Sequence, residues 1–177
     1  MSGNGQQQVL LFFRKAISCA FKGNHLPDSL LFKPYLYAGS VHHTLNNLDS
    51  AKYYYSKAEA INDLNRGIGE SERLFNKSGA LYYETGDYRK SIRYFEKALS
   101  VVENKTNPDV FFIVNYKNNI AIALLKLKEY EKAVKIFNTI LPYHIAQNEL
   151  YYNMGNAYSD EGDYTTALHY LNQVVVF

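Results

Sequence analysis

The side chains that could support acid–base, nucleophilic or metal chemistry are few and scattered along the chain. A single cysteine, Cys19, excludes an internal disulfide and any metal site that needs several cysteines. No two histidines have the i, i+4 spacing with a glutamate that zinc hydrolases use, and no glycine-rich phosphate loop or Gly-x-Ser-x-Gly turn occurs. The five histidines are His25, His42, His43, His144 and His169. We therefore expect no enzyme activity, no cofactor and no metal site.

The composition is that of a folded protein with a balanced surface. Of the 177 residues, 47% are hydrophobic and 20% are charged, and the formal net charge is only +2. Lysine and glutamate alternate along the chain, so the field that would attract nucleic acid or anionic lipid is missing. No apolar run approaches the roughly 20 residues of a membrane span. We expect a cytoplasmic protein with neither a nucleic-acid nor a membrane partner.

An internal repeat dominates the sequence. The tripeptide Gly86-Asp87-Tyr88 returns as Gly162-Asp163-Tyr164, and the flanking residues recur with it. Small residues allow two antiparallel helices to approach closely, and large ones fill the space beside them. The small residues that precede each turn are Gly39, Gly79, Ala121 and Gly155, and the large residues that follow are Tyr55, Phe95, Phe137 and Leu171. This spacing predicts a series of helical hairpins.

The turn residues have definite expected roles. Gly86 and Gly162 suit the left-handed residue that ends a helix, and Asp87 and Asp163 suit the N-cap of the next helix. Asn47 can serve as the corresponding cap in the first hairpin.

The segment Phe75-x2-Ser78-Gly79-x2-Tyr82, followed by the Gly86 turn and Phe95, resembles the tetratricopeptide repeat. The resemblance implies an all-α fold, a right-handed α-α superhelix of about four helical hairpins plus a partial one at the N-terminus. It also assigns His42 and the template tyrosines to the core. Those tyrosines are Tyr55, Tyr82, Tyr88, Tyr158 and Tyr164.

The repeat boundaries define the expected domain organisation, a single solenoid over 9–177. Residues 1–8 are expected to be a disordered tail or an artificial extension. The units are a partial repeat at 9–25 and repeats at 32–65, 72–105, 114–147 and 148–177. The apolar edge Val174–Phe177 has no polar capping helix, which indicates either a fragment of a longer protein or a self-associating end.

A narrower resemblance is to the repeats of bacterial proteins that join them to a caspase-like CHAT peptidase. It rests on the texture of Leu26–Tyr55, with Pro27-Asp28-Ser29-Leu30 ahead of the helix. Repeats longer than the common period of about 34 residues also resemble those of kinesin light chains and of Pins-type polarity scaffolds.

The resemblance also implies a binding surface, because the first helix of each hairpin lines the concave groove in tetratricopeptide superhelices. Asn119 and Asn153 fall at the same template position, where asparagine amides can pair with the backbone of an extended peptide. The alternative is that these asparagines are polar residues on a solvated helix face. The expected peptide-binding residues are Tyr37, Ser40, Lys77, Tyr83, Asn119, Ile122, Lys126, Asn153 and Asn156.

The sequence therefore predicts a protein–protein interaction scaffold that binds a peptide or protein segment in its concave groove. One alternative is a regulatory or sensor region of a larger bacterial protein with a C-terminal CHAT peptidase or signalling domain. Another is a self-assembly module that uses the C-terminal edge.

Overall fold

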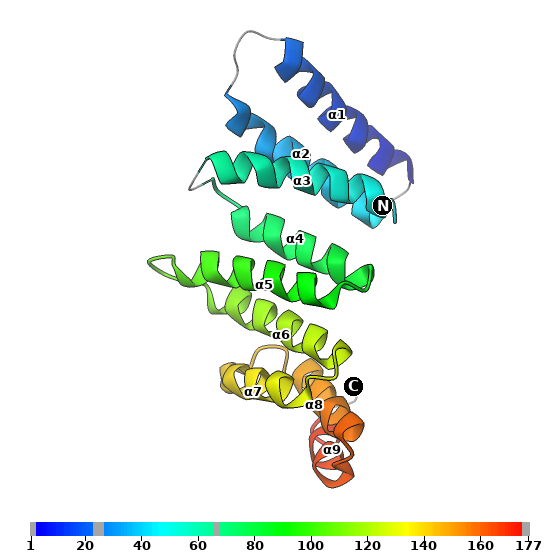
Figure 1. Ribbon diagram of the computed structural model, residues 1–177, viewed down its shortest axis with the longest axis vertical. Coiled ribbons are helices and arrows are strands. Elements are labelled where there is room, and N and C mark those ends of the chain that lie inside the picture. The colour runs from blue at the N-terminus through cyan, green and yellow to red at the C-terminus, as the bar shows by residue number, and fades with distance from the viewer. Residues whose placement is uncertain (1–2, 23–26, 66–67, 175–177) are drawn as a thin grey trace. The chain divides into compact units, whose positions relative to one another are not determined.

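The computed structural model describes residues 3–22, 27–65 and 68–174, and in these ranges the chain is entirely helical (Figure 1). Nine α-helices and two short 3-10 helices account for the described elements, without a β-strand among them. The predicted all-α class is thereby confirmed. His25 lies outside the described residues.

The chain divides into two compact units, Met1–Leu81 and Tyr82–Phe177. The first unit contains α1 (Gly3–Lys22), η1 (Asp28–Leu31), α2 (Phe32–Thr44), α3 (Leu48–Leu64) and most of α4 (Ser71–Glu84). The second contains the last turn of α4, α5 (Tyr88–Glu103), α6 (Val110–Lys126), α7 (Tyr130–Ile140), η2 (Leu141–Tyr143), α8 (Gln147–Glu161) and α9 (Tyr164–Leu171).

Small residues bring paired helices into close contact in both units. A Cβ atom placed on Gly39 of α2 would lie 2.6 Å from two ring carbons of Tyr55 in α3. A Cβ atom on Gly155 of α8 would lie 2.5 Å from Cγ of Leu171, the last residue of α9. Because these are equivalent positions of the repeat, the predicted pairing of small with large residues is confirmed in the first and last hairpins.

The turns between paired helices follow one backbone pattern. Gly86 and Gly162 have φ values of 82° and 94°, as their predicted left-handed role requires. Asp87 Oδ1 accepts a hydrogen bond from the Lys90 amide at 3.1 Å, and Asp163 Oδ1 accepts one from the Thr166 amide at 3.1 Å. Both predicted N-caps are therefore confirmed.

The other two hairpins make the same turn with less suitable residues. Asn46 and Lys128 take the positive-φ position, at 58° and 60°. Asn47 and Glu129 are the N-cap residues that follow, but neither side chain accepts a capping hydrogen bond. Asn47 is therefore the N-cap residue of α3, as predicted, but its side chain does not make the capping hydrogen bond that the prediction implied.

The core of the second unit is formed by residues from α5, α6, α7 and α8. Ala121 and Phe137 are fully buried there and correspond to the small and large positions of their hairpin. Phe95 joins the same cluster from α5, and Leu150 and Met154 join it from α8. Successive hairpins therefore share one apolar interior, as the repeat pattern predicts.

The residues that the repeat pattern assigns to the core are buried to different degrees. Tyr55 and His42 are 2% and 6% exposed, which confirms their core assignment. Tyr164 is 72% exposed, so its predicted core assignment is wrong. It begins α9, which contacts α8, and no later described helix covers it. Tyr88, at the matching position of α5, packs its ring edge-on against Tyr83.

The two ends of the chain carried separate predictions, a disordered tail at the N-terminus and a self-associating apolar edge at the C-terminus. Helix α1 begins at Gly3, within the segment expected to be a tail, and packs on α2. Of the apolar edge proposed for self-association, residues 175–177 lie outside the described part of the chain. No described helix is both long and apolar enough to cross a lipid bilayer.

Candidate functional site

Five of the nine predicted binding residues lie on α6 and α8 in the second unit. We call this set, which comprises Asn119, Ile122, Lys126, Asn153 and Asn156, the α6–α8 face. The Lys126 side chain is exposed, and the other four are half-buried. Half-buried amides around an apolar side chain can contact a ligand through hydrogen bonds and through apolar area together.

Helix geometry explains why these residues are not buried members of the core, although half-buried Ile122 packs against its edge. On α6, residues at i, i+3 and i+7 share one stripe, which places Asn119, Ile122 and Lys126 together. Ile120 and Leu124 lie on a different stripe of the same helix and belong to the core cluster. The core therefore fixes the rotation of α6, and that rotation presents the α6–α8 face.

A buried asparagine that the sequence analysis missed connects the two helices. Asn118 is 5% exposed, and its Nδ2 donates to Oε1 of Glu149 at 2.8 Å. Asn153 Nδ2 donates in turn to Oδ1 of Asn118 at 3.4 Å. Asn153 thus contacts Asn118 across the hairpin junction, so part of its hydrogen-bonding capacity holds α8 against α6. The asparagine-rich run in α6 was the available signal, but the repeat template gave Asn118 no role.

Two polar groups of the α6–α8 face remain available for a ligand. Within the described part of the chain, neither the Asn156 amide nor the Lys126 ammonium group has a hydrogen-bond or ion-pair partner. The Asn156 amide offers one acceptor and a donor group to a ligand, and a peptide backbone can pair with both.

The predicted binding residues of the first unit are mostly engaged internally. Tyr37 Oη donates to Glu70 Oε2 at 2.8 Å and accepts from Arg73 Nη1 at 3.0 Å. Ser40 Oγ donates to the carbonyl oxygen of Leu36 at 3.0 Å. Lys77 is exposed and has no ion-pair partner among the residues described. The structure thus uses Tyr37 and Ser40 as structural contacts.

Glu70 organises the polar cluster around Tyr37. Lys33 Nζ lies 2.9 Å from Glu70 Oε1, and Arg73 Nη1 lies 3.2 Å from Glu70 Oε2. The Lys33 hydrogen bond, followed by that of Tyr37, lowers the pKa of the Glu70 carboxyl below its ordinary value. Glu70 also has a φ of 75°, in the left-handed region that glutamate rarely adopts. Its side chain contacts Lys33 and Tyr37 of α2 and Arg73 of α4.

Tyr83, the remaining predicted residue, belongs to the second unit. Its ring packs edge-on against Tyr88, with ring centroids 5.4 Å apart. The residue is half-buried, so its ring supports the start of α5 while part of it stays accessible. Its expected role in binding stays a prediction.

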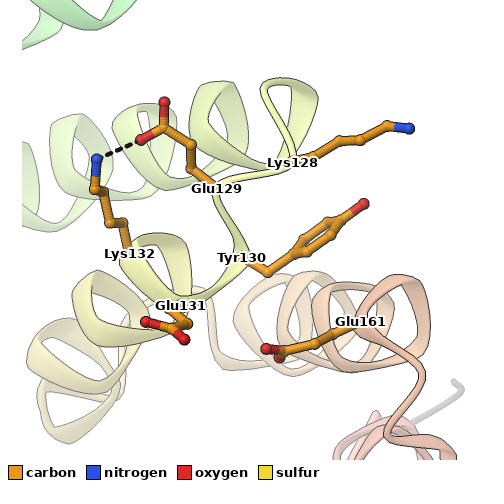
Figure 2. A pocket seen from close by; sticks show the side chains of 6 residues that line it. All are labelled: Lys128, Glu129, Tyr130, Glu131, Lys132 and Glu161. Carbon is orange, nitrogen blue, oxygen red and sulfur yellow. Dashed lines mark hydrogen bonds and ion pairs between the residues drawn. The ribbon is translucent and has the colours of Figure 1, made fainter.

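An open pocket of about 400 Å³ lies at the turn between α6 and α7, close to the end of α8 (Figure 2). In Figure 2 the Lys128 side chain extends away from the Glu131 and Glu161 carboxylates, and all three residues line the pocket. Lys132 Nζ donates to Glu129 Oε2 at 2.6 Å, and this bond lowers the pKa of the Glu129 carboxyl. None of the nine predicted binding residues lines this pocket.

The lining of this pocket comprises three glutamates, two lysines and one tyrosine. No group of three or more histidine, cysteine, aspartate or glutamate side chains in the described ranges is placed to hold a metal ion.

Comparison with known proteins agrees with this architecture. Residues 70–146 and 149–175 match tetratricopeptide repeat models, and the two segments together make up more than half of the chain. Over 169 residues, 96% of the chain, the sequence is 26% identical to anaphase-promoting complex subunit CDC16 of Saccharomyces cerevisiae. The chain spans 18% of the length of that yeast protein.

Two solved structures share the fold. BtubC (BKLC) from P. vanneervenii superposes with a TM-score of 0.82 at 17% identity, over 96% of this chain and 72% of that one. YrrB, described as a TPR protein with an unusual peptide-binding site, superposes with a TM-score of 0.73 at 20% identity, over 97% and 77% of the two chains. At these identities the likeness establishes the arrangement of helices alone.

Proposed function

Because this chain belongs to the tetratricopeptide repeat family, we propose that it is a protein-interaction module whose α6–α8 face holds an extended segment of a protein partner. The kind of partner is supported by relatives: one is a subunit of a multiprotein complex and another has a peptide-binding site. The proposal for this chain rests on its own residues.

The single observation that carries the proposal is the Asn156 amide. It is half-buried and lacks a hydrogen-bond partner in the described residues, one helical turn from Asn153. An extended peptide lying across α6 and α8 would receive a donor and an acceptor from each amide, without regard to its side chains. Ile122 would contact an apolar side chain of the peptide, and Lys126 an acidic one.

The test begins with peptides selected from a displayed random library on the full chain. The affinity of a selected peptide is then measured for the wild type, for Asn156→Ala and for a control, Asn138→Ala. Asn138 is an exposed asparagine on α7. We expect Asn156→Ala to weaken binding about tenfold, the effect of losing roughly one well-formed bidentate contact, and Asn138→Ala to leave it unchanged.

The predicted asparagine ladder is tested by Asn119→Ala combined with Asn153→Ala. Affinity should fall further than in Asn156→Ala alone, while circular dichroism shows little loss of helix. Because Asn153 also contacts Asn118, the melting temperature of each single variant separates a binding effect from a folding effect. Unchanged peptide affinity in the double variant would remove the ladder from the account.

The regulatory region of a CHAT-type protein and the self-assembly module stay predictions. The cytoplasmic location and the lack of enzyme activity are likewise proposals. Reading the gene beyond Phe177 tests the first alternative, because a downstream peptidase region would support it. Light scattering across concentrations tests the second, since a strictly monomeric chain would contradict it.

A further inference from the structure

A second groove lies on a different face of the second unit, between α5 and α7. Its volume is about 540 Å³, within the range of ligand-binding clefts. Five aliphatic side chains form its apolar lining: Ile92 on α5, Ile120 and Leu124 on α6, Leu127 directly after α6, and Ile136 on α7. Ile120 and Leu124 are buried members of the core, so the floor of this α5–α7 groove is fixed by the fold.

The α5–α7 groove is separate from the α6–α8 face. Ile120 and Leu124 on α6, together with Leu127, the residue that directly follows this helix, form a stripe at i, i+4 and i+7 that lines the groove. At 100° per residue, this stripe lies about 130° around the helix from the stripe formed by Asn119, Ile122 and Lys126. A ligand in one site therefore leaves the other open.

The rim of the groove is predominantly cationic. Arg89, Arg93, Lys132 and Lys135 line it, against the two carboxylates Glu96 and Glu129. The Glu129 carboxylate already forms two ion pairs, because Lys132 Nζ lies 2.6 Å from its Oε2 and Arg89 Nη2 lies 3.8 Å from its Oε1.

Two of these cations make no ion pair within the part of the chain that the structure describes. Neither Arg93 nor Lys135 has an ion-pair partner anywhere in the described ranges, and both side chains are exposed. Arg93 extends from α5 and Lys135 from α7, and both line the groove. An anionic ligand that also carries apolar side chains would satisfy both features of the groove.

We propose that the α5–α7 groove is a docking site for an acidic amphipathic helix of a partner protein. Leucine-like side chains at i, i+3 and i+4 would enter between Ile92 and Ile136. Carboxylates flanking that apolar stripe would pair with Arg93 and Lys135. The lining contains no aromatic side chain on which a nucleobase could stack, so the groove favours a protein over a nucleic acid.

The probe for this proposal is a fluorescein-labelled helical peptide with leucines at i, i+3, i+4 and i+7 and glutamates beside them. The control peptides are a scrambled peptide of the same composition and a version with lysine in place of glutamate. Fluorescence anisotropy is measured with the full wild-type chain, with Arg93→Gln/Lys135→Gln and with the control Lys128→Gln. Lys128 is an exposed lysine of the same unit that does not line the groove.

We expect the wild type and Lys128→Gln to bind the glutamate peptide equally, and the double variant to bind it about tenfold more weakly. The scrambled and lysine peptides should bind poorly. In methyl NMR spectra, the signals of Ile92 and Ile136 should shift on titration, and those of Ile122 should not. A peptide selected on the α6–α8 face should fail to displace the probe, so the two proposals can fail separately.

Three results would overturn the proposal. The first is no measurable binding of the glutamate peptide, and the second is equal affinity in the wild type and the double variant while both chains retain their helicity. The third is a single-stranded DNA oligonucleotide that binds through Arg93 and Lys135 more tightly than the peptide does.

Discussion

Gly39 of α2 faces the ring of Tyr55 in α3 so closely that an added Cβ atom would lie 2.6 Å from its Cδ1 and Cε1 atoms. Tyr55 is almost fully buried, and its hydroxyl donates to Ser40 Oγ at 3.4 Å. The Tyr55 ring is therefore fixed by its packing against Gly39 and by the hydrogen bond of its hydroxyl to Ser40. Helices α2 and α3 approach as closely as a glycine permits.

Gly39→Ala should consequently destabilise the chain. Alanine gains about 1 kcal/mol of helix propensity, but overpacking against a fixed ring costs about 1–3 kcal/mol, so we expect a net loss of about 1 kcal/mol. Urea denaturation measures the change. Gly69→Ala is the control, because nothing lies within 4 Å of the added Cβ atom there. A Gly39→Ala variant as stable as the wild type would contradict this view of the α2–α3 contact.

The helix caps give a second prediction from paired sites. Asp87→Ala should lower the free energy of unfolding by about 1 kcal/mol, because the Asp87 carboxylate accepts from the Lys90 amide at the start of α5. Asn47→Ala should have a smaller effect, since the Asn47 side chain makes no capping bond. Thermal melts followed by circular dichroism compare the two. Equal losses of stability in the two variants would contradict the prediction, because they would show that the capping hydrogen bond of Asp87 adds nothing to the free energy of unfolding.

These contacts also show how far the sequence could predict the structure. Gly39, Gly86 and Asp87 have roles set by steric limits and local backbone geometry, which act over a few residues or one helix pair and recur with the repeat. The hydrogen bond from Asn118 to Glu149 depends on which side chains meet across a hairpin junction. Periodicity carries no information about such a meeting.

The candidate site was less predictable for the same reason. Tyr37 lies on the predicted stripe, but its hydroxyl is committed to Glu70, a residue in the loop before α4. The template identified the face of the helix and could not identify which polar groups on it the protein already uses. Asn156 and Lys126 emerge as available only when all hydrogen bonds are counted.

His42 gives a prediction for pH. Both ring nitrogens are buried without a hydrogen-bond partner among the described residues, and the ring stacks on Tyr54 at 5.2 Å. Burial, followed by the charge of Arg14, lowers the pKa of His42 from its ordinary value of 6.5. The unfolded chain therefore binds a proton more readily than the folded chain. Stability from this residue is present above pH 6.5 and declines as the pH falls toward the folded pKa.

The test replaces His42 with leucine, the residue at the equivalent position 124 of the third repeat. We expect His42→Leu to be about 1 kcal/mol more stable than the wild type near neutral pH, since two unpaired buried polar atoms are removed. Its advantage should grow between about pH 7.5 and about pH 5.5. Parallel pH profiles for the two proteins would show that His42 remains neutral or is solvated in both states.

Glu70 gives the opposite pH dependence. Its pKa is lowered from the ordinary value of 4.5, so its contribution is present above that value and disappears as the pH falls through the folded pKa. Glu70→Gln should lower the free energy of unfolding by about 0.5 kcal/mol at neutral pH, a small amount because solvent screens the partly exposed carboxylate. The difference should shrink in high salt and at acidic pH. A difference that is independent of salt would point to the backbone at Glu70 instead.

The most direct test of the central claim, that the α6–α8 face receives a partner segment, is an NMR titration of the asparagine side-chain amides. A peptide selected on the chain is added to the isotope-labelled protein, and the Nδ2 resonances of Asn156 and Asn138 are followed. The account predicts that the Asn156 resonances shift and saturate with the binding curve while those of Asn138 stay in place. Saturable binding that leaves the Asn156 resonances unmoved would contradict it.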